Sequence, residues 1–303
     1  MTVADPIVIV IVNYNSGPYL ARCLASIAEH ASAARVIVVD NASADGSECA
    51  AEMSSERVTL VRSDRNMGFA AAANRAVRMS PAGAGAVMLV NPDCELFSGV
   101  VERLAAELEA FPDCAVVGPK ILDEDGAVQG SVRGDPTLMT GLFGRSTLLT
   151  RLFPSSPWAR RNVRSDLTDS ASGSSDVVDW VSGACQMIRR TAFDSVKGLD
   201  ERYFLYWEDA DLCRRLRGLG FTTRYQPNGR VMHRGAVSSR SALPLSIRAF
   251  HESAYRYYAT HIGRTATQRR LVWFVLHCLC AWKLFVQASP ADSDAQRALR
   301  TAR

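Results

Sequence analysis

Carboxylate and amide side chains occur at four places in this chain of 303 residues where they could bind a ligand or move a proton. Three places follow short apolar runs: Asn13, Asp40 and the segment Asn91-Pro92-Asp93. The fourth is the acidic segment 207–212, Trp-Glu-Asp-Ala-Asp-Leu. Carboxylates can accept charge-assisted hydrogen bonds, ligate a divalent cation or take a proton from a hydroxyl group. The structural alternative is that strand ends need polar loops and that helix N-termini favour acidic residues.

A repeated β-α pattern would bring the first three places together. Four apolar runs are predicted to be strands, at residues 7–12, 35–40, 58–62 and 86–90. Segments with helical spacing follow them, at residues 19–28, 42–53, 69–79 and 99–110. This alternation predicts a doubly wound, mostly parallel sheet through about residue 120, and such sheets bind ligands at the carboxyl ends of their strands. The sequence lacks a GxGxxG motif after the first strand and a GxxxxGK[ST] motif, which argues against a dinucleotide-binding Rossmann site and a P-loop.

Beyond residue 120 the regular alternation stops. Residues 154–176 are rich in Pro, Ser and Arg, and we expect a mobile loop over the active site there. Residues 177–188 are predicted to form strand and turn. Helices are predicted at residues 208–219, 245–262 and 271–286.

Composition narrows the class of protein. The chain is 48% hydrophobic and 22% charged, which excludes a disordered tail protein, a collagen-like repeat and a multi-span membrane protein. Its eight cysteines form no CxxC pair and suit no zinc site. The first apolar run is short and has no basic residue before it, unlike a signal peptide, so the expected compartment is the cytoplasm.

The motifs resemble those of the inverting glycosyltransferases of family 2, and among them the bacterial rhamnosyltransferase-like branch. The resemblance covers about residues 7–235. Six motifs carry it: VNYN at 12–15, VDNAS at 39–43, NMGFAAAAN at 66–74, LVNPD at 89–93, WVSGACQMIRR at 180–190 and FDSVKGLDERYFLYWEDADLCRRL at 193–216. The implied fold is the α/β GT-A fold, a mostly parallel central sheet flanked by helices, here with a helical C-terminal extension. The implied parts are a nucleotide-sugar-binding half (1–120), an acceptor and catalytic half (121–238) and a C-terminal region (239–303).

The resemblance implies a dTDP- or UDP-sugar donor held by residues at the strand ends: Asn13, Asp40, Asn66, Gly68 and Asp93. Asp40 can accept a hydrogen bond from the N3–H of uracil or thymine; the alternative is an Asx-type turn into the next helix. Gly68 permits close backbone approach, and the helix N-terminus after it favours a diphosphate. The alternative for this segment is a helix cap with a glycine turn.

The resemblance also implies a divalent metal, Mg²⁺ or Mn²⁺, and a general base. Of the usual DxD-like motif this chain keeps only the last carboxylate, Asp93, while His233 matches a position where related enzymes supply a histidine ligand. Asp209 matches the base of the ED motif, and Glu208 would hold Asp209 or bind the acceptor. Trp180 offers a flat face for an acceptor sugar. The structural alternatives are a structural histidine for His233, an acidic helix N-terminus for Glu208 and Asp209, and a core tryptophan for Trp180.

The positive charge is concentrated at the C-terminus. Residues 240–303 carry ten basic and three acidic side chains, a net charge of +7, against −3 for residues 1–239. The apolar stretch 271–288 is shorter than the roughly 20 apolar residues of a membrane span and is interrupted by one His and one Lys. With its tryptophans and basic flanks it predicts an in-plane helix on an anionic membrane surface, so that the enzyme is peripheral on the inner face of the cell membrane. The alternative is a C-terminal helix packed on the body.

The predicted function is therefore transfer of a sugar, best L-rhamnose from dTDP-rhamnose, to a glycan or polyprenyl-linked glycan in cell-wall or surface polysaccharide synthesis. A UDP-hexose or galactofuranose donor is one alternative. A nucleotidyltransferase is another, but residues 13–18 lack the basic residue expected in its glycine-rich loop. A non-catalytic lipid- or nucleic-acid-binding protein is disfavoured by the acidic body, and no nucleic acid partner is expected.

Overall fold

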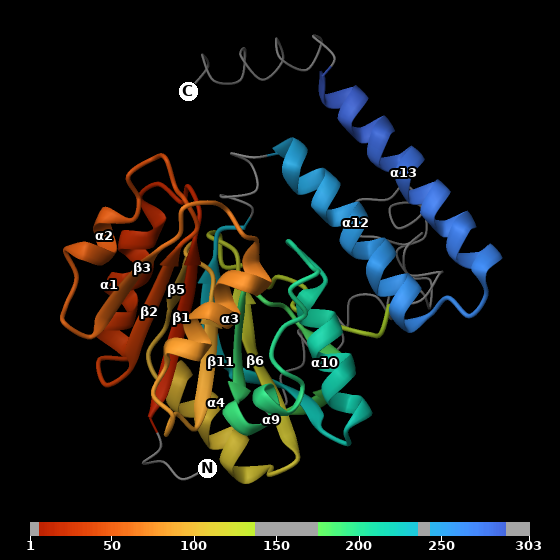
Figure 1. The fold of residues 1–303 in the computed structure, drawn as a ribbon. Helices are drawn as coiled ribbons and strands as arrows, with labels where there is room; N and C mark the ends of the chain where they lie inside the picture. The colour runs from red at the N-terminus through yellow and green to blue at the C-terminus, as the bar shows by residue number, and fades with distance from the viewer. Residues whose placement is uncertain (1–5, 137–174, 236–242, 289–303) are drawn as a thin grey trace.

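The structure, a computed structural model, describes residues 6–136, 175–235 and 243–288, and its centre is one large mixed sheet (Figure 1). Its strands follow the order β3-β2-β1-β4-β10-β6-β11-β5, and β8 pairs with β11. Their bounds are β1 Ile7–Asn13, β2 Arg35–Asp40, β3 Val58–Arg62, β4 Ala86–Val90, β5 Cys94–Leu96, β6 Cys114–Leu122, β8 Asp176–Val178, β10 Cys185–Arg189 and β11 Thr222–His233. A separate pair is formed by β7 (Val132–Arg133) and β9 (Trp180–Val181).

The predicted parallel arrangement holds for the N-terminal half of the sheet. β1 lies parallel to β2 and β4, and β2 lies parallel to β3. In the other half β10 runs antiparallel to both β4 and β6, while β11 is parallel to β6 and antiparallel to β5. The sheet is thus a parallel half joined through β10 to a mixed half.

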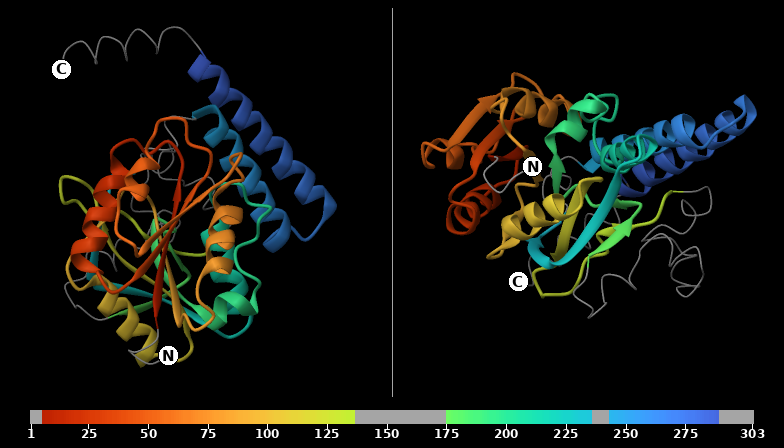
Figure 2. Two further views of the ribbon diagram at one scale, coloured as in Figure 1. Left: turned by 60° about the vertical axis from the view of Figure 1, so that its left-hand side comes forward. Right: turned by 90° about the horizontal axis from the view of Figure 1, so that it is seen from below.

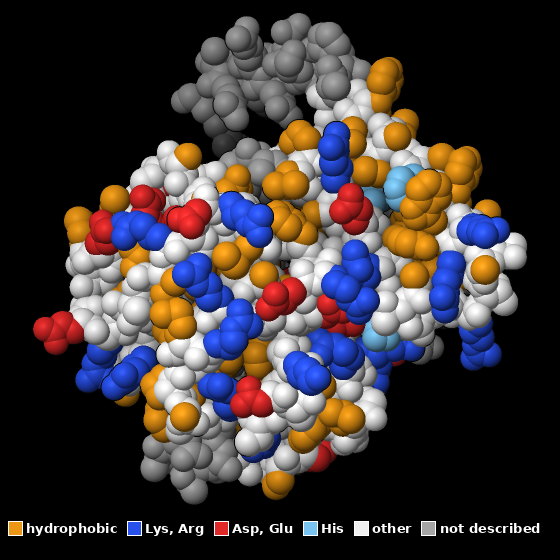
Figure 3. Space-filling model, in the orientation of Figure 1, with side chains coloured by type: hydrophobic (Ala, Val, Ile, Leu, Met, Phe, Trp, Pro, Cys, Tyr) orange, Lys and Arg blue, Asp and Glu red, His pale blue; other side chains and the backbone are white. Residues whose placement is uncertain are grey.

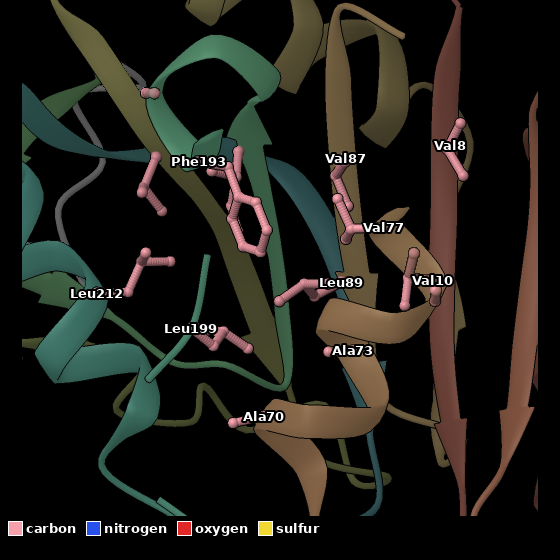
Figure 4. Packing of buried hydrophobic residues seen from close by; sticks show 14 of the residues in the cluster. Val8, Val10, Ala70, Ala73, Val77, Val87, Leu89, Phe193, Leu199 and Leu212 are labelled. Carbon is pink, nitrogen blue, oxygen red and sulfur yellow. The ribbon is translucent and has the colours of Figure 1, made fainter. Parts of the chain in front are cut away.

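Helices cover both faces of this sheet (Figure 2). The structure describes α1 Tyr19–His30, α2 Cys49–Glu52, α3 Phe69–Met79, α4 Val100–Ala110, α9 Arg190–Ser195, α10 Glu208–Gly218, α12 Leu243–His261 and α13 Ala266–Ala288. One buried cluster lies between the sheet and α3, α9 and α10, where Leu89, Phe193 and Leu212 pack together (Figure 4). The other lies on the opposite face under α1 and α4. Alternating apolar residues of β1, β2, β4 and β10 supply both clusters, as a sheet covered on both faces requires.

Two predicted helices differ in length from the structure by more than two residues. The helix expected at 42–53 is reduced to α2, because residues 41–48 form a loop whose polar side chains bond backbone groups, and Ala42 has a φ of 64°. The last helix is longer than expected: Ala266–Gln287 is long and apolar enough to cross a membrane, and none of its apolar window is buried. The loop expected at 154–176 lies outside the described residues except for 175 and 176.

Candidate active site

The carboxyl ends of the first three strands lie level with one another. Asn13 is paired with Asp40 across β1 and β2, and Asp40 is paired with Arg62 across β2 and β3. The Asn13 side chain is fully buried, and its Nδ2 donates to Asp40 Oδ1 at 2.9 Å and to the Ser47 hydroxyl at 2.9 Å. The predicted donor residues Asn13 and Asp40 are therefore joined in one hydrogen-bonded group at this edge.

Asp40 also forms the turn that was the structural alternative for it. Its Oδ2 accepts a hydrogen bond from the Ser43 backbone N–H at 3.1 Å, and the side chain is 4% exposed. A carboxylate has about four acceptor positions, so these two bonds leave capacity for a further donor. The turn and the recognition of a base are compatible, and the second role stays a prediction.

Gly68 is needed for a contact that the sequence did not reveal. Its φ is +84°, and a Cβ there would lie 2.5 Å from the backbone oxygen of Phe204. The first N–H of α3, from Phe69, donates to the same oxygen at 2.7 Å. The glycine thus lets the loop before α10 approach the loop after β3, and its predicted contact with a diphosphate remains untested.

Asn41 holds the loop that contains Asn66. Asn41 was not among the predicted site residues. Its Nδ2 donates to Asn66 Oδ1 at 2.8 Å, and its Oδ1 accepts from the Met67 N–H at 2.9 Å. Asn66 Oδ1 in turn accepts from the Gly68 N–H at 2.9 Å. The signal was present, because Asn41 directly follows Asp40 in the VDNAS motif.

The turn before β10 links the fourth strand end to the acidic helix. Asn91 N–H donates to the Ala184 oxygen at 2.8 Å. The next residue back, Gly183, donates its N–H to Asp209 Oδ2 at 2.8 Å, and a Cβ on it would lie 3.2 Å from that oxygen. The adjacent residues Gly183 and Ala184 thus connect Asp209 to the Asn91-Pro92-Asp93 segment.

Glu208 and Asp209 differ in hydrogen bonding and therefore in proton affinity. Asp209 accepts a second N–H bond, from Ala210 at 2.8 Å, whereas Glu208 Oε2 is buried with no hydrogen-bond partner among the described residues. Burial and the neighbouring Asp209 charge raise the pKa of Glu208 to about 8. Burial also raises the pKa of Asp209, but its two N–H bonds oppose that rise. The arrangement favours a proton on Glu208 and a charge on Asp209.

The segment before these carboxylates has an unfavourable backbone that α12 supports. Tyr206 and Trp207 have φ values of 68° and 71°, which side chains of this size rarely adopt. The Trp207 ring packs against Tyr257 and Phe250 of α12, with ring centroids 5.3 and 6.0 Å apart. Ser253 of the same helix donates to the Leu205 oxygen at 3.0 Å. Such conformations cluster at functional sites and persist only where the surroundings hold them.

The predicted metal ligands lie together. His233 Nε2 is 3.3 Å from Asp93 Oδ1, and Cys94 also has its sulfur within 4.8 Å of these two atoms. The Cys94 thiol, however, donates to the Ala184 oxygen at 3.3 Å, and burial raises its pKa well above the usual value. Two ligand atoms so close together, one from a carboxylate and one from an imidazole, fit a divalent cation such as Mn²⁺.

Trp180 lies in β9 and is half-buried. Its indole N–H donates to the Gly134 oxygen at 3.0 Å, and the Arg133 guanidinium lies 5.5 Å from the ring centroid. Its side chain also packs against the cluster formed by Tyr203, Ala210 and Tyr257. The Trp180 ring therefore has a packing role, which was the structural alternative given for it. Its contact with an acceptor sugar stays a prediction.

Comparisons with known proteins show the family of this chain. Residues 8–158 match the family described as Glycosyl transferase family 2. The N-acetylglucosaminyl-diphospho-decaprenol L-rhamnosyltransferase of Mycobacterium tuberculosis is 34% identical over 265 residues, which cover 84% of each chain. The rhamnosyltransferase WbbL of Escherichia coli is 37% identical over a shorter region, 28% of this chain and 33% of that protein.

Solved structures share the fold. The mannosyltransferase PcManGT from Pyrobaculum calidifontis, in complex with GDP-Man and Mn²⁺, matches with a TM-score of 0.57 and 15% identity, covering 99% of this chain and 81% of that one. GalNAc-T7 with UDP, GalNAc and Mn²⁺ matches with the same TM-score and identity, covering 94% of this chain and 58% of that one. At this identity the likeness concerns the fold alone.

Proposed function

Because this chain belongs to glycosyl transferase family 2 and is a glycosyltransferase with the GT-A fold, we propose that it transfers L-rhamnose from dTDP-rhamnose to a polyprenyl-linked glycan. The observation that carries the proposal is the 34% identity over 84% of both chains with a rhamnosyltransferase named for such an acceptor. The transfer would be a single inverting displacement, in which an acceptor hydroxyl attacks the anomeric carbon opposite the departing diphosphate.

In this mechanism Asp209 takes the proton from the acceptor hydroxyl. Two N–H groups, from Gly183 and Ala210, stabilise its ionised form and leave it able to accept a proton. Glu208 stays protonated near neutral pH, because burial and the adjacent charge raise its pKa to about 8. Its neutral carboxyl can donate a hydrogen bond to an acceptor oxygen without repelling Asp209. Trp180 would line the acceptor side.

The donor would lie along the strand ends. Asn13 and Asp40 form the base-reading group, and Asn66 and Gly68 form the loop beside the diphosphate. Asp93 and His233 would hold a divalent metal, Mn²⁺ or Mg²⁺, since their ligand atoms are 3.3 Å apart. A bound divalent cation would neutralise negative charge on the leaving diphosphate.

Base recognition by Asp40 can be tested with nucleotides alone. We expect dTDP to raise the melting temperature of the wild-type protein more than GDP does, because the donor proposed for Asp40 is the N3–H of thymine or uracil, whereas guanine carries its N–H donors on a larger ring of different shape. Asp40→Ala should weaken dTDP binding by roughly 10–100-fold, the usual value of a hydrogen bond to a charged group. The measurement is a thermal-shift panel of dTDP, UDP and GDP, confirmed by calorimetry.

Asp45→Ala is the matched control for Asp40→Ala. Asp45 holds the same loop, through hydrogen bonds from the Gly17 and Ser47 N–H groups at 2.8 and 3.0 Å, but it is not at the strand end. It should keep the preference for dTDP. An Asp40→Ala protein with unchanged affinity and preference would contradict the assignment.

The C-terminal helices support a location at the inner face of the cell membrane. Apolar side chains gather along α13, at the upper right of Figure 3. The most exposed are Leu271, Phe274, Trp282 and Phe285, at 61–73% exposure. Among the residues of α13 whose burial the structure describes, 266–287, only the stripe of Val272, Leu276, Cys280 and Leu284 is partly covered, and α13 packs on α12. Basic side chains at Arg264, Arg269 and Arg270 precede the apolar segment, which suits anionic lipid.

We favour an in-plane helix over a span for α13. α12 is attached to the catalytic body, since its Tyr257 is 1% exposed and His261 Nε2 lies 2.7 Å from Asp211 Oδ1. Immersing α12 and α13 together would bury Arg248 and Glu252, each at a cost of a few kcal/mol. An in-plane position buries the outer face of α13 and leaves α12 on the body. The division at residue 238 stays a prediction, and these contacts argue that α12 works with the catalytic part.

Membrane attachment predicts a specific loss on substitution. Replacing Phe274, Trp282 and Phe285 together by Ser should weaken binding to anionic phosphatidylglycerol vesicles by at least about 100-fold, because burying one such side chain contributes roughly 1.5–3 kcal/mol. The control replaces Met53 and Leu219 by Ser; these residues are 85% and 58% exposed and are not part of α13. Co-sedimentation of the full-length proteins measures both. Unchanged sedimentation of the triple variant would contradict the apolar docking surface. Equal binding of the wild type to neutral and to anionic vesicles would contradict the role of the basic side chains.

A further inference from the structure

We propose that Gln129 is a positioning residue for the metal site, because its side-chain amide fixes the His233 ring with Nδ1–H toward Gln129 and Nε2 toward Asp93. The inference rests on the proposed metal-binding role of Asp93 and His233. It concerns a residue in a part of the chain that none of the recognised motifs contains.

Gln129 reaches His233 from the hairpin that follows β6. Its backbone N–H donates to the Ile121 oxygen at 2.8 Å, and the adjacent Val128 forms a β-bridge with Leu122. His233 is the last residue of β11, which lies parallel to β6. The two residues are 104 positions apart in the chain, so only the sheet brings them together.

The hydrogen bonds determine which way the Gln129 amide points. Nε2 donates to the backbone oxygen of His233 at 2.6 Å and also to the carboxylate of Asp123. Both partners are acceptors only, so the opposite orientation would place the amide oxygen against two oxygens. Oε1 must therefore be the atom that lies 3.0 Å from His233 Nδ1.

This orientation determines the tautomer of His233. Oε1 can only accept, so Nδ1 must carry the ring hydrogen, and in the neutral ring Nε2 then has a lone pair. Nε2 lies 3.3 Å from Asp93 Oδ1, so a cation placed between these two atoms could be bound by both. A histidine that donates its other ring N–H to a fixed acceptor is the usual arrangement at metal sites.

Gln129 makes both of its bonds to His233 with one amide group, one to the ring and one to the backbone. The Asp123 carboxylate holds the amide from the other side, so the order of contacts is Asp123, Gln129, His233, Asp93. Loss of the amide would free the ring to rotate and to adopt the other tautomer. The expected consequence is weaker metal binding with the ligands themselves intact.

Gln129→Met tests this, because it has a similar size and cannot make either hydrogen bond. In the presence of dTDP, we expect the affinity for Mn²⁺, measured by electron paramagnetic resonance, to fall about 10–100-fold. The affinity for dTDP without metal should match that of the wild type. Val128→Ala is the matched control from the same hairpin and should keep the Mn²⁺ affinity.

A second measurement does not depend on the variant folding. Long-range ¹H–¹⁵N spectra of the wild-type protein at pH 8 without metal, with His233 identified through His233→Asn, should show the hydrogen on Nδ1. A ring that carries its hydrogen on Nε2 and none on Nδ1 would overturn the inference, as would unchanged Mn²⁺ affinity in Gln129→Met. If the wild-type protein with dTDP binds no Mn²⁺, both the proposed metal site and this inference are wrong. Sugar transfer, measured separately, then shows whether the proposed function is still correct.

Discussion

Asp209→Asn is expected to lower kcat by about 10²–10⁴-fold, the usual contribution of a general base, while the affinity for dTDP-rhamnose stays within a few-fold of wild type. An amide at this position has a similar size, but its single oxygen can accept from only one of the Gly183 and Ala210 N–H groups, and it cannot take a proton from the acceptor. Single-turnover transfer measures the first effect and calorimetry the second. Near wild-type turnover in Asp209→Asn would show that another group is the base.

Glu208→Gln is the matched control, because it makes the same carboxylate-to-amide change at the neighbouring residue and leaves Asp209 intact. A neutral amide imitates the protonated Glu208, so most of the activity should remain near neutral pH. Burial raises the pKa of Asp209, so kcat/KM should fall on acidification at a higher pH than an exposed Asp base would give. Any loss of activity that accompanies ionisation of Glu208 near pH 8 should disappear in Glu208→Gln. Inactive Glu208→Gln beside active Asp209→Asn would reverse the two roles.

Asp93→Ala is the second substitution with a large expected effect. It removes the carboxylate that faces His233 Nε2 at 3.3 Å and leaves one protein ligand at the proposed metal site. A metal stabilises developing charge by several kcal/mol, so kcat/KM should fall at least about 100-fold. The increase in donor affinity that Mn²⁺ gives the wild type should disappear. Donor titrations with and without Mn²⁺ measure this difference.

Glu124→Gln provides the comparison for Asp93→Ala. Glu124 is an exposed carboxylate that pairs with Arg234, the residue after His233, so the control changes local charge without removing a proposed ligand. It should keep metal-dependent donor binding. If Asp93→Ala also keeps it, Asp93 does not hold the metal.

The parallel half of the sheet could be predicted because each strand is marked by its own residues. The run Ile7–Val12 is continuous and β-branched, and a strand buried on both faces requires this pattern. The helix expected at 42–53 could not be predicted correctly, because Asn41, Ser43 and Asp45 bond to loop groups that come close only after folding. β6 and β11 were missed because Gly118, Pro119 and the irregular pairing near Gln226 interrupt their patterns.

The carboxylates of the site could be proposed from motifs, but the contacts between them could not. Asp93 and His233 are far apart in sequence, and the pairing of β11 with β5 and β6 is what brings them together. Gly68 illustrates the limit most clearly: the sequence indicates a close backbone approach there, but the group that approaches it in the structure is the backbone of Phe204. Gln129 carries no motif at all, and only the folded hairpin reveals its contact with His233.

The most direct test of the proposed function is transfer by the purified full-length protein. The protein is incubated with dTDP-rhamnose, Mn²⁺ and a polyprenyl-diphosphate-linked N-acetylglucosamine acceptor, and the lipid product is analysed by mass spectrometry alongside released dTDP. We predict that the acceptor gains one deoxyhexosyl residue for each dTDP released, and that the Asp209→Asn protein gives neither product above background. An unchanged acceptor with the wild-type protein, while a UDP-sugar supplied in parallel is consumed and transferred, would contradict the assignment of the donor.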